Sequence, residues 1–167
     1  ADDHGIGDPR HGFRGLRIAD SPVLGYAQGA VDPEVASSVA AAVRELESLG
    51  ALVEQVDPGI EDPLDVCTGL WFVGAWTIWN SLDARQQELT DPDFRAEAQL
   101  GSKYSALDVQ RLVIKRGALG AHMRQFMQSF DLLVTPTVAV PAFDARPAGH
   151  ASTHSANPPP ANNRQYW

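Results

Sequence analysis

The sequence predicts an α/β fold, with a small sheet flanked by helices and one βαβ unit near its start. Three observations lead to this prediction. A short apolar strand, an amphipathic helix and a second strand follow one another over residues 16–56, which is the order of a βαβ unit. Two further helical patterns occupy much of residues 62–129. The uncharged run Leu132–Val134 then predicts a strand buried on both faces, which Pro136 ends because proline has no N–H to give to a ladder.

Helix and turn signals delimit the βαβ unit. Leu16–Ala19 forms the first strand, and Ser21-Pro22 ends it. Asp32 is placed to cap the following helix, and Gly50 lies just past its end. Residues 52–56 form the second strand, so we expect the two strands to be parallel. The apolar face of the helix between them comprises Val35, Val39, Val43 and Leu46.

The two later helices differ in their predicted burial. The first starts at Asp62-Pro63 and is apolar nearly all round from Leu70 to Trp79, so we expect it to be buried or covered by a partner. A connector marked by Asp91-Pro92 and Gly101 follows. The Ser-x-x-Asp pattern at residues 105–108 predicts a capping box for the second helix. Its expected buried stripe comprises Val109, Leu112, Val113, Met123, Phe126, Met127 and Phe130, with Gly117 and Gly120 permitting close packing.

Composition and charge narrow the class of protein. The chain has 167 residues, of which 44% are apolar and 20% charged, and this suits one globular domain. Its net charge of −8 counts against nucleic acid or an anionic membrane as a partner, because both require a basic face. The longest apolar run, residues 70–78, is too short to span a bilayer. We expect residues 1–15 to form a linker, 16–145 an α/β segment, and 146–167 a Pro/Asn-rich tail that is cut short.

The sequence holds no complete set of catalytic or metal-binding residues. Its one cysteine, Cys67, lies in an apolar run and is expected to be a buried, inert thiol, which together with the polar start of the chain suits the cytoplasm. His150 and His154 have the spacing of helical metal ligands, but they lie in the tail without an acidic or cysteine ligand. Gly-x-Ser-x-Gly, Walker and His-Glu-x-x-His motifs are absent from the sequence. We therefore expect no metal and no cofactor.

Several short motifs occur in the order of a known family. They are Gly15–Ile18, Val31–Val35, Leu46–Ala51, Leu70–Phe72, Gly74-Ala75, Ser105–Asp108, Arg116 and Asp131–Thr137. In this order and spacing, residues 13–145 resemble a middle segment of the amidase signature family. The resemblance implies an amidohydrolase fold with a mixed central sheet covered by helices.

By this resemblance, the catalytic residues are a serine nucleophile, a second serine in a cis peptide and a lysine base. They require a stretch of the Gly-Gly-Ser-Ser-x-Gly-Ser kind, which this sequence lacks. Ser37-Ser38 lies in a helix without flanking glycines, and the only lysines, Lys103 and Lys115, lie in the connector and in a helix. No catalytic residue carries over, so we expect the missing residues N-terminal to Ala1 and this chain to be inactive by itself.

The resemblance also indicates residues of a substrate pocket. In relatives, the loop after the Thr-Pro strand faces the acyl part of the substrate, and aromatic residues of the Leu-Trp region lie nearby. The candidate pocket residues are therefore Thr135, Thr137, Val138, Trp71 and Phe72, each with core packing as its competing role. Independently of the family, the carboxyl end of a strand is where ligands bind in open α/β sheets.

The sequence thus predicts a segment of an amidase that contributes scaffold and pocket wall, with a small-molecule amide as substrate. A transamidase subunit and a free-standing α/β binding or interaction module are the alternatives, and homo-oligomerisation is left open. The acidic charge counts against a transamidase that acts on charged tRNA. Tryptophan exposure separates the other two: a free-standing domain buries Trp71, Trp76, Trp79 and Trp167, whereas a segment exposes some of them.

Overall fold

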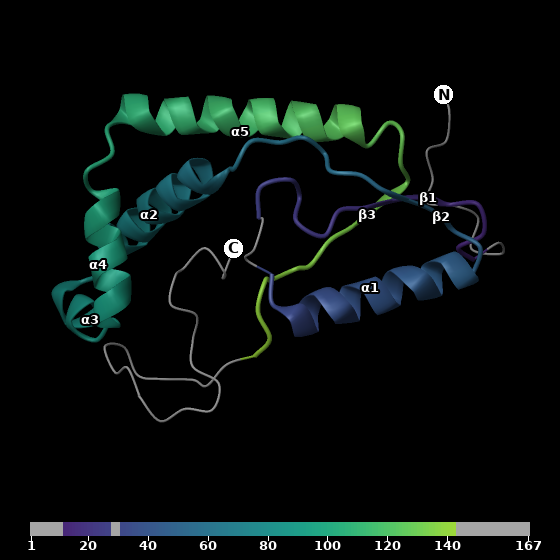
Figure 1. Cartoon of the computed structure of the whole chain (residues 1–167). Coiled ribbons are helices and arrows are strands. Elements are labelled where there is room, and N and C mark those ends of the chain that lie inside the picture. Colours follow the sequence, from purple (N-terminus) through teal and green to yellow (C-terminus); the bar gives the residue numbers. More distant parts are fainter. Residues whose placement is uncertain (1–11, 28–30, 143–167) are drawn as a thin grey trace. The chain divides into compact units, whose positions relative to one another are not determined.

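The computed structural model describes residues 12–27 and 31–142 (Figure 1). Contacts within the chain divide them into two compact units. The first unit comprises the described residues up to 62 together with 120–142, and the second comprises 63–119. Most of the expected linker and the whole of the expected tail lie outside the described residues.

The first unit is built on a three-stranded parallel sheet. β1 (Arg17–Asp20) lies in the centre, between β2 (Leu52–Gln55) and β3 (Leu132–Val134). α1 (Pro33–Ser48) connects β1 to the parallel strand β2, which confirms the predicted βαβ unit. Ile18 of the central strand is fully buried, so the core of this unit is centred on β1.

β3 differs from the buried strand that its sequence predicts. Its three residues are only half-buried, because the strand lies at the edge of the sheet with β1 on one side. Its start is fixed by Asp131, which donates its N–H to the Arg17 carbonyl (2.8 Å) and accepts the Arg17 N–H at Oδ2 (2.8 Å). This bond from the Arg17 N–H, followed by the Arg17 side chain, lowers the pKa of the Asp131 carboxyl. The strand ends at Val134, as Pro136 predicts.

α1 begins and ends where its sequence predicts. The Asp32 carboxylate accepts the Glu34 N–H at 2.8 Å and so caps the helix. Gly50, just past the helix, adopts φ +95°, and a Cβ there would lie 3.3 Å from the Arg14 Cα. Glycine is therefore required at this position both for the left-handed conformation and for the close approach of the chain. Val43 of the predicted apolar face is buried.

The second unit consists of helices. They are α2 (Leu64–Ser81), α3 (Ala84–Glu88), α4 (Pro92–Gly101) and α5 (Ala106–Phe126), whose last turns belong to the first unit. The prediction of a connector after α2 is wrong, because Asp91-Pro92 starts a helix there. Asp91 caps α4 by accepting the Asp93 N–H (2.8 Å), and Pro92 takes the first helical position. Asp83 and Gln86 form a capping box for the short helix α3.

α2 and α4 pack with almost no space between their backbones. A Cβ built on Gly101 would lie 1.9 Å from the Phe72 carbonyl oxygen and 2.8 Å from the Trp76 Cβ. Only glycine fits at such a crossing. The Arg95 guanidinium of α4 lies 5.6 Å from the centroid of the Trp79 ring of α2, a cation–π contact between the same two helices.

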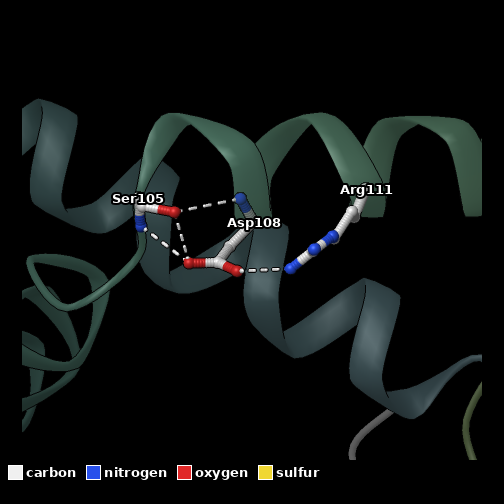
Figure 2. Close-up of polar contacts among 3 residues, drawn as sticks. All are labelled: Ser105, Asp108 and Arg111. Carbon is white, nitrogen blue, oxygen red and sulfur yellow. Dashed lines mark hydrogen bonds and ion pairs between the residues drawn. The ribbon is translucent and has the colours of Figure 1, made fainter.

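α5 starts with the predicted capping box, which Figure 2 shows. The Asp108 N–H donates to Ser105 Oγ at 3.2 Å, and the Ser105 N–H donates to Asp108 Oδ2 at 3.0 Å. Arg111 Nη1 lies 3.5 Å from Asp108 Oδ1, one turn further along the helix. The hydrogen bonds from Ser105, ahead of the Arg111 charge, lower the pKa of the Asp108 carboxyl.

The predicted buried stripe of α5 is confirmed only at Leu112. This residue is buried against α2, where a Cβ on Gly69 would lie 2.6 Å from the Leu112 Cδ1. Val113 is exposed, and the other predicted members are half-buried. The prediction of close packing at Gly117 and Gly120 is also wrong. A Cβ on Gly117 would meet nothing within 4 Å, and one on Gly120 would meet only the side chain of an arginine of the same helix. α5 is apolar on more than one side, so periodicity alone does not fix its covered face.

Candidate functional site

The carboxyl ends of the three parallel strands meet at one edge of the sheet. From the central strand β1 the chain passes to β2 on one side, and β3 lies on the other side. The ends of β1 and β3 therefore flank a topological switch point, which is where ligands bind in open α/β sheets. We call this region the carboxyl edge and define it by Asp20, Ser21, Asp57 and the loop 135–139.

Ser21 joins the ends of all three strands at the carboxyl edge. It is fully buried directly after β1. Its N–H donates to the Val134 carbonyl at the end of β3 (3.0 Å), and its Oγ donates to Asp57 Oδ1 just beyond β2 (2.6 Å). A hydrogen bond to a carboxylate is stronger than one between neutral groups. Ser21 thus fixes where the chain leaves the sheet after β2 and after β3.

The loop after β3 is held at its far end as well. The Ala139 carbonyl accepts the Asp32 N–H at 2.7 Å, beside the start of α1. Between the two anchors Thr137 and Val138 are exposed, Val138 to 45%. The hydroxyls of Thr135 and Thr137 have no hydrogen-bond partner among the described residues. Three of the five residues predicted for the pocket therefore share one anchored loop, with side chains available to a ligand.

The loop after β1 carries backbone strain. Leu24 has φ +53° and is the only non-glycine residue with a positive φ among those that the structure describes. The next residue, Gly25, has φ +80°, and a Cβ there would lie 3.6 Å from the Asp57 Cβ. Strained residues cluster at ligand sites and switch regions. This strain lies beside Asp57 and so adds the loop after β1 to the carboxyl edge.

Asp20, the last residue of β1, has a pKa raised above its ordinary value. Burial of the carboxyl group is the largest cause, and the negative charge of Glu47 adds to it. Its Oδ1 atom is buried and has no hydrogen-bond partner among the described residues. In the folded protein the ionised form of Asp20 is thus less favourable than in the unfolded chain.

Replacing Asp20 with asparagine is expected to stabilise the protein at pH 7 relative to the parent chain. Because the folded pKa lies above the unfolded value of 3.8, the folded parent holds its proton more tightly. The free energy of unfolding of the parent therefore falls as the pH rises from the unfolded pKa of Asp20 through its folded pKa. The difference in free energy of unfolding between Asp20→Asn and the parent should grow from pH 3 to pH 7, measured by urea unfolding. A difference that stays constant with pH would contradict the raised pKa.

The two aromatic pocket candidates lie in the other unit, on α2. Trp71 is 51% exposed, and its Nε1 donates to Glu97 Oε2 of α4 at 2.8 Å. Phe72 is half-buried, and its carbonyl oxygen faces Gly101. The structure places these residues in a different unit from loop 135–139, so a pocket shared by both groups stays a prediction.

The structure tests the predicted burial of Cys67, and its described residues can be searched for metal sites and for membrane-spanning helices. Cys67 is exposed, so the expectation of a buried thiol is wrong. Within residues 12–27 and 31–142, no group of three or more histidine, cysteine or acidic side chains is arranged to hold a metal ion. In the same part of the chain no helix has both the length and the apolar character to cross a membrane. His150 and His154 lie outside the described residues.

Sequence reasoning missed Asp20, Ser21 and Asp57 as residues of the candidate site. Ser21 and Asp57 each precede a proline, and this pattern indicates only the end of a strand. Their position directly after two strands was a usable signal, since such residues line ligand sites at a switch point. The strand order that creates the switch point comes from the structure.

Comparison with known proteins gives two relatives with matching sequence. An acylamidase from Rhodococcus erythropolis is 33% identical over 135 residues, which are 80% of this chain and 28% of the acylamidase. An amidase from Pseudomonas putida is 30% identical over 146 residues, covering 75% of this chain and 31% of the amidase. This chain therefore spans less than a third of the length of each. No protein-family model matches the sequence.

Two solved structures share the fold of the chain. A bacterial aryl acylamidase of the amidase signature family superposes with a TM-score of 0.68 at 22% identity, over 87% of this chain and 32% of that one. The crystal structure of an amidase superposes with a TM-score of 0.69 at 21% identity, over 91% of this chain and 34% of that one. The predicted fold class, a part of this mixed α/β architecture, is confirmed.

Proposed function

Since this chain is related in sequence to bacterial amidases and shares the fold of the amidase signature enzymes, we propose that it forms part of an amide hydrolase. It contributes scaffold and one wall of the substrate pocket. The serine nucleophile and the lysine base come from outside these 167 residues. The observation that carries this proposal is the 33% identity to an acylamidase over 135 residues.

The carboxyl edge supports the assignment of a pocket wall. Thr135, Thr137 and Val138 lie on a loop whose two ends are held by backbone hydrogen bonds from Ser21 and Asp32. A wall that orients a substrate must keep its place when the substrate binds, because small displacements of a bound reactant slow the reaction strongly. The two threonine hydroxyls offer hydrogen bonds, and Val138 offers an apolar contact for an acyl group.

The surroundings of the lysines and serines support a non-catalytic role for this chain. The Lys115 ammonium pairs with the exposed Asp65 carboxylate, so its partner is a carboxylate and not a serine hydroxyl. Ser37 and Ser38 are exposed on α1, and this helix contains no lysine. A serine nucleophile needs a base within hydrogen-bonding distance. We therefore assign no catalytic residue to this chain.

Tryptophan exposure favours a segment of a larger domain over a free-standing module. Trp71 is half-exposed and Trp76 and Trp79 are only partly buried, although a free-standing domain of this size would bury them. Trp167 lies outside the described residues. The second unit thus carries aromatic surface that a larger domain would cover.

The test is a chimera in which this chain replaces the segment of the Rhodococcus erythropolis acylamidase that it matches. The chimera is expected to hydrolyse an amide substrate of that acylamidase with a kcat/KM within about 100-fold of the host enzyme, the loss typical of small misplacements. The chain alone is expected to give no hydrolysis above buffer. The host with the segment deleted serves as the control. A chimera that folds, as judged by circular dichroism, but has no activity would contradict the proposal.

The proposal extends to substrate and location. We assign a small-molecule amide as substrate, because the relatives carry the names acylamidase and amidase. A cytoplasmic location suits a chain with a single cysteine and therefore no internal disulfide. Homo-oligomerisation belongs to the same proposal and is measured by light scattering on the chimera.

A further inference from the structure

α2 is the most apolar of the described helices, and α4 on one side and Leu112 of α5 at Gly69 cover only part of its surface. Among its 18 residues only Asp65 is charged. One face packs against α4, where Gly101 meets the Phe72 backbone and Arg95 lies over the Trp79 ring. A helix that is apolar all round is normally buried on all sides. The part of the α2 surface that neither α4 nor α5 covers is therefore the surface to explain.

This uncovered part carries an apolar stripe, with Trp71 at its border to α4, where the Trp71 Nε1–H donates to Glu97 Oε2. Cys67, Trp71, Gly74 and Ile78 recur at steps of four, three and four residues, so they lie one above the other on the helix. All four are exposed, Ile78 to 55%. A Cβ built on Gly74 meets nothing within 4 Å, so the stripe has an open notch between Trp71 and Ile78. We call this surface the α2 stripe.

We infer that the α2 stripe is the docking surface for an apolar helix from the part of the amidase domain that lies outside this chain. The side chains of Trp71 and Ile78 form ridges, and Gly74 forms the groove between them, the arrangement by which helices pack. No residue of the stripe is charged, and the Glu97 carboxylate of α4 at its border accepts the Trp71 Nε1–H, so the stripe itself offers apolar contacts rather than ion pairs. The partner must present apolar side chains at helical spacing.

The relatives indicate where this partner comes from. The chain superposes on only 32% and 34% of the two solved amidase structures, although 87% and 91% of the chain is included. The remaining two-thirds of those structures have no counterpart in it. The inference names the partner of the proposed amidase segment and so rests on the proposed function, but its test has a separate readout.

The native thiol provides this readout, because Cys67 is the only cysteine and lies in the stripe. In the isolated chain it is expected to react with a maleimide at the rate of an exposed thiol. In the chimera with the acylamidase host, freed of host cysteines, the reaction should slow by about tenfold or more because the partner helix covers it. The matched control is Cys67→Ser combined with Glu88→Cys, an exposed site on α3 outside the stripe, which reports the general reactivity of the chimera.

A second variant, Gly74→Leu, is expected to change the Tm in opposite directions in the isolated chain and in the chimera. Gly74→Leu places a good helix former in open space, so the Tm of the isolated chain should rise by about 2–5 °C. In the chimera the same leucine fills the notch that receives the partner helix, so the Tm should fall. Gly117→Leu, also in open space in the isolated chain, is the control for helix propensity and should raise its Tm similarly.

The outcomes separate the docking inference from the proposed function. A chimera that hydrolyses amide but leaves Cys67 fully reactive overturns the docking inference while the proposed function stands. A protected Cys67 in an inactive chimera supports docking and counts against the function. Protection of Cys67 in the isolated chain that grows with protein concentration identifies a second copy as the occupant and overturns the inference. A Tm increase for Gly74→Leu in both proteins also overturns it.

Discussion

Replacing Gly101 with leucine is expected to destabilise the second unit by about 3 kcal/mol or more, at the upper end of the range for overpacking. A Cβ at this position would lie 1.9 Å from the Phe72 carbonyl oxygen, and backbone cannot move aside as a flexible side chain does. α4 would have to separate from α2 and lose the contact between Arg95 and Trp79. Urea unfolding followed by tryptophan fluorescence measures the effect, since three of the four tryptophans lie in α2.

Gly117→Ala is the control for this substitution. A Cβ at Gly117 meets nothing within 4 Å, so alanine should raise the stability by about 0.5–1 kcal/mol through its better helix propensity. The substitutions at Gly101 and Gly117 are thus expected to change the free energy of unfolding in opposite directions. An unchanged urea midpoint for Gly101→Leu would show that α2 and α4 do not pack as described.

Removing the Ser21 hydroxyl is expected to cost about 1.5–2 kcal/mol, the lower part of the range for a hydrogen bond to a charged group. Ser21 is fully buried, whereas Asp57 is exposed and regains water when its partner is lost. Ser21→Ala keeps the N–H that donates to the Val134 carbonyl, but it frees the backbone at position 21 from Asp57, so the loop after β3 should also loosen. Faster amide hydrogen exchange over residues 132–139 than in the parent chain measures this second effect.

Ser48→Ala is the matched control for the Ser21 variant. Its Oγ donates to the Glu45 carbonyl within α1 and is exposed, so the change in stability should stay within about 0.5 kcal/mol. Exchange over residues 132–139 should not change. Equal effects of the two substitutions would contradict the role of Ser21 at the carboxyl edge.

Local signals allowed the first unit to be predicted from the sequence. The cap at Asp32, the left-handed glycine at Gly50 and the strand-ending Pro136 each act through one residue and its immediate neighbours. The capping box of α5 was predicted for the same reason. Such signals depend on backbone chemistry, which the surrounding fold does not change.

Burial could not be predicted as well, because it depends on which elements meet. α2 and α5 are apolar on more than one side, so their periodicity left open which side is covered, and Cys67 and Val113 were assigned wrongly. The pair Asp91-Pro92 fits a turn as well as a helix start, and the structure decides for the helix. Gly101 appeared as a helix breaker, yet it is required by the crossing of α2 over α4.

The sequence indicated one loop of the candidate site, and its role in binding substrate stays a prediction. The resemblance to the amidase family identified the loop with Thr135, Thr137 and Val138, which the structure places at the carboxyl edge. Ser21 and Asp57 were missed because their hydrogen bond joins residues 36 positions apart. Only the order of the strands brings them together.

The most direct test of the central claim, that this chain shapes an amidase without supplying its nucleophile, is to locate the reactive serine. The active chimera is labelled with a fluorophosphonate, which reacts with activated serines, and the labelled residue is mapped by mass spectrometry. The claim predicts label on a serine of the host part and none on any serine of this chain, including Ser37 and Ser38. Label on a serine of this chain would contradict the claim.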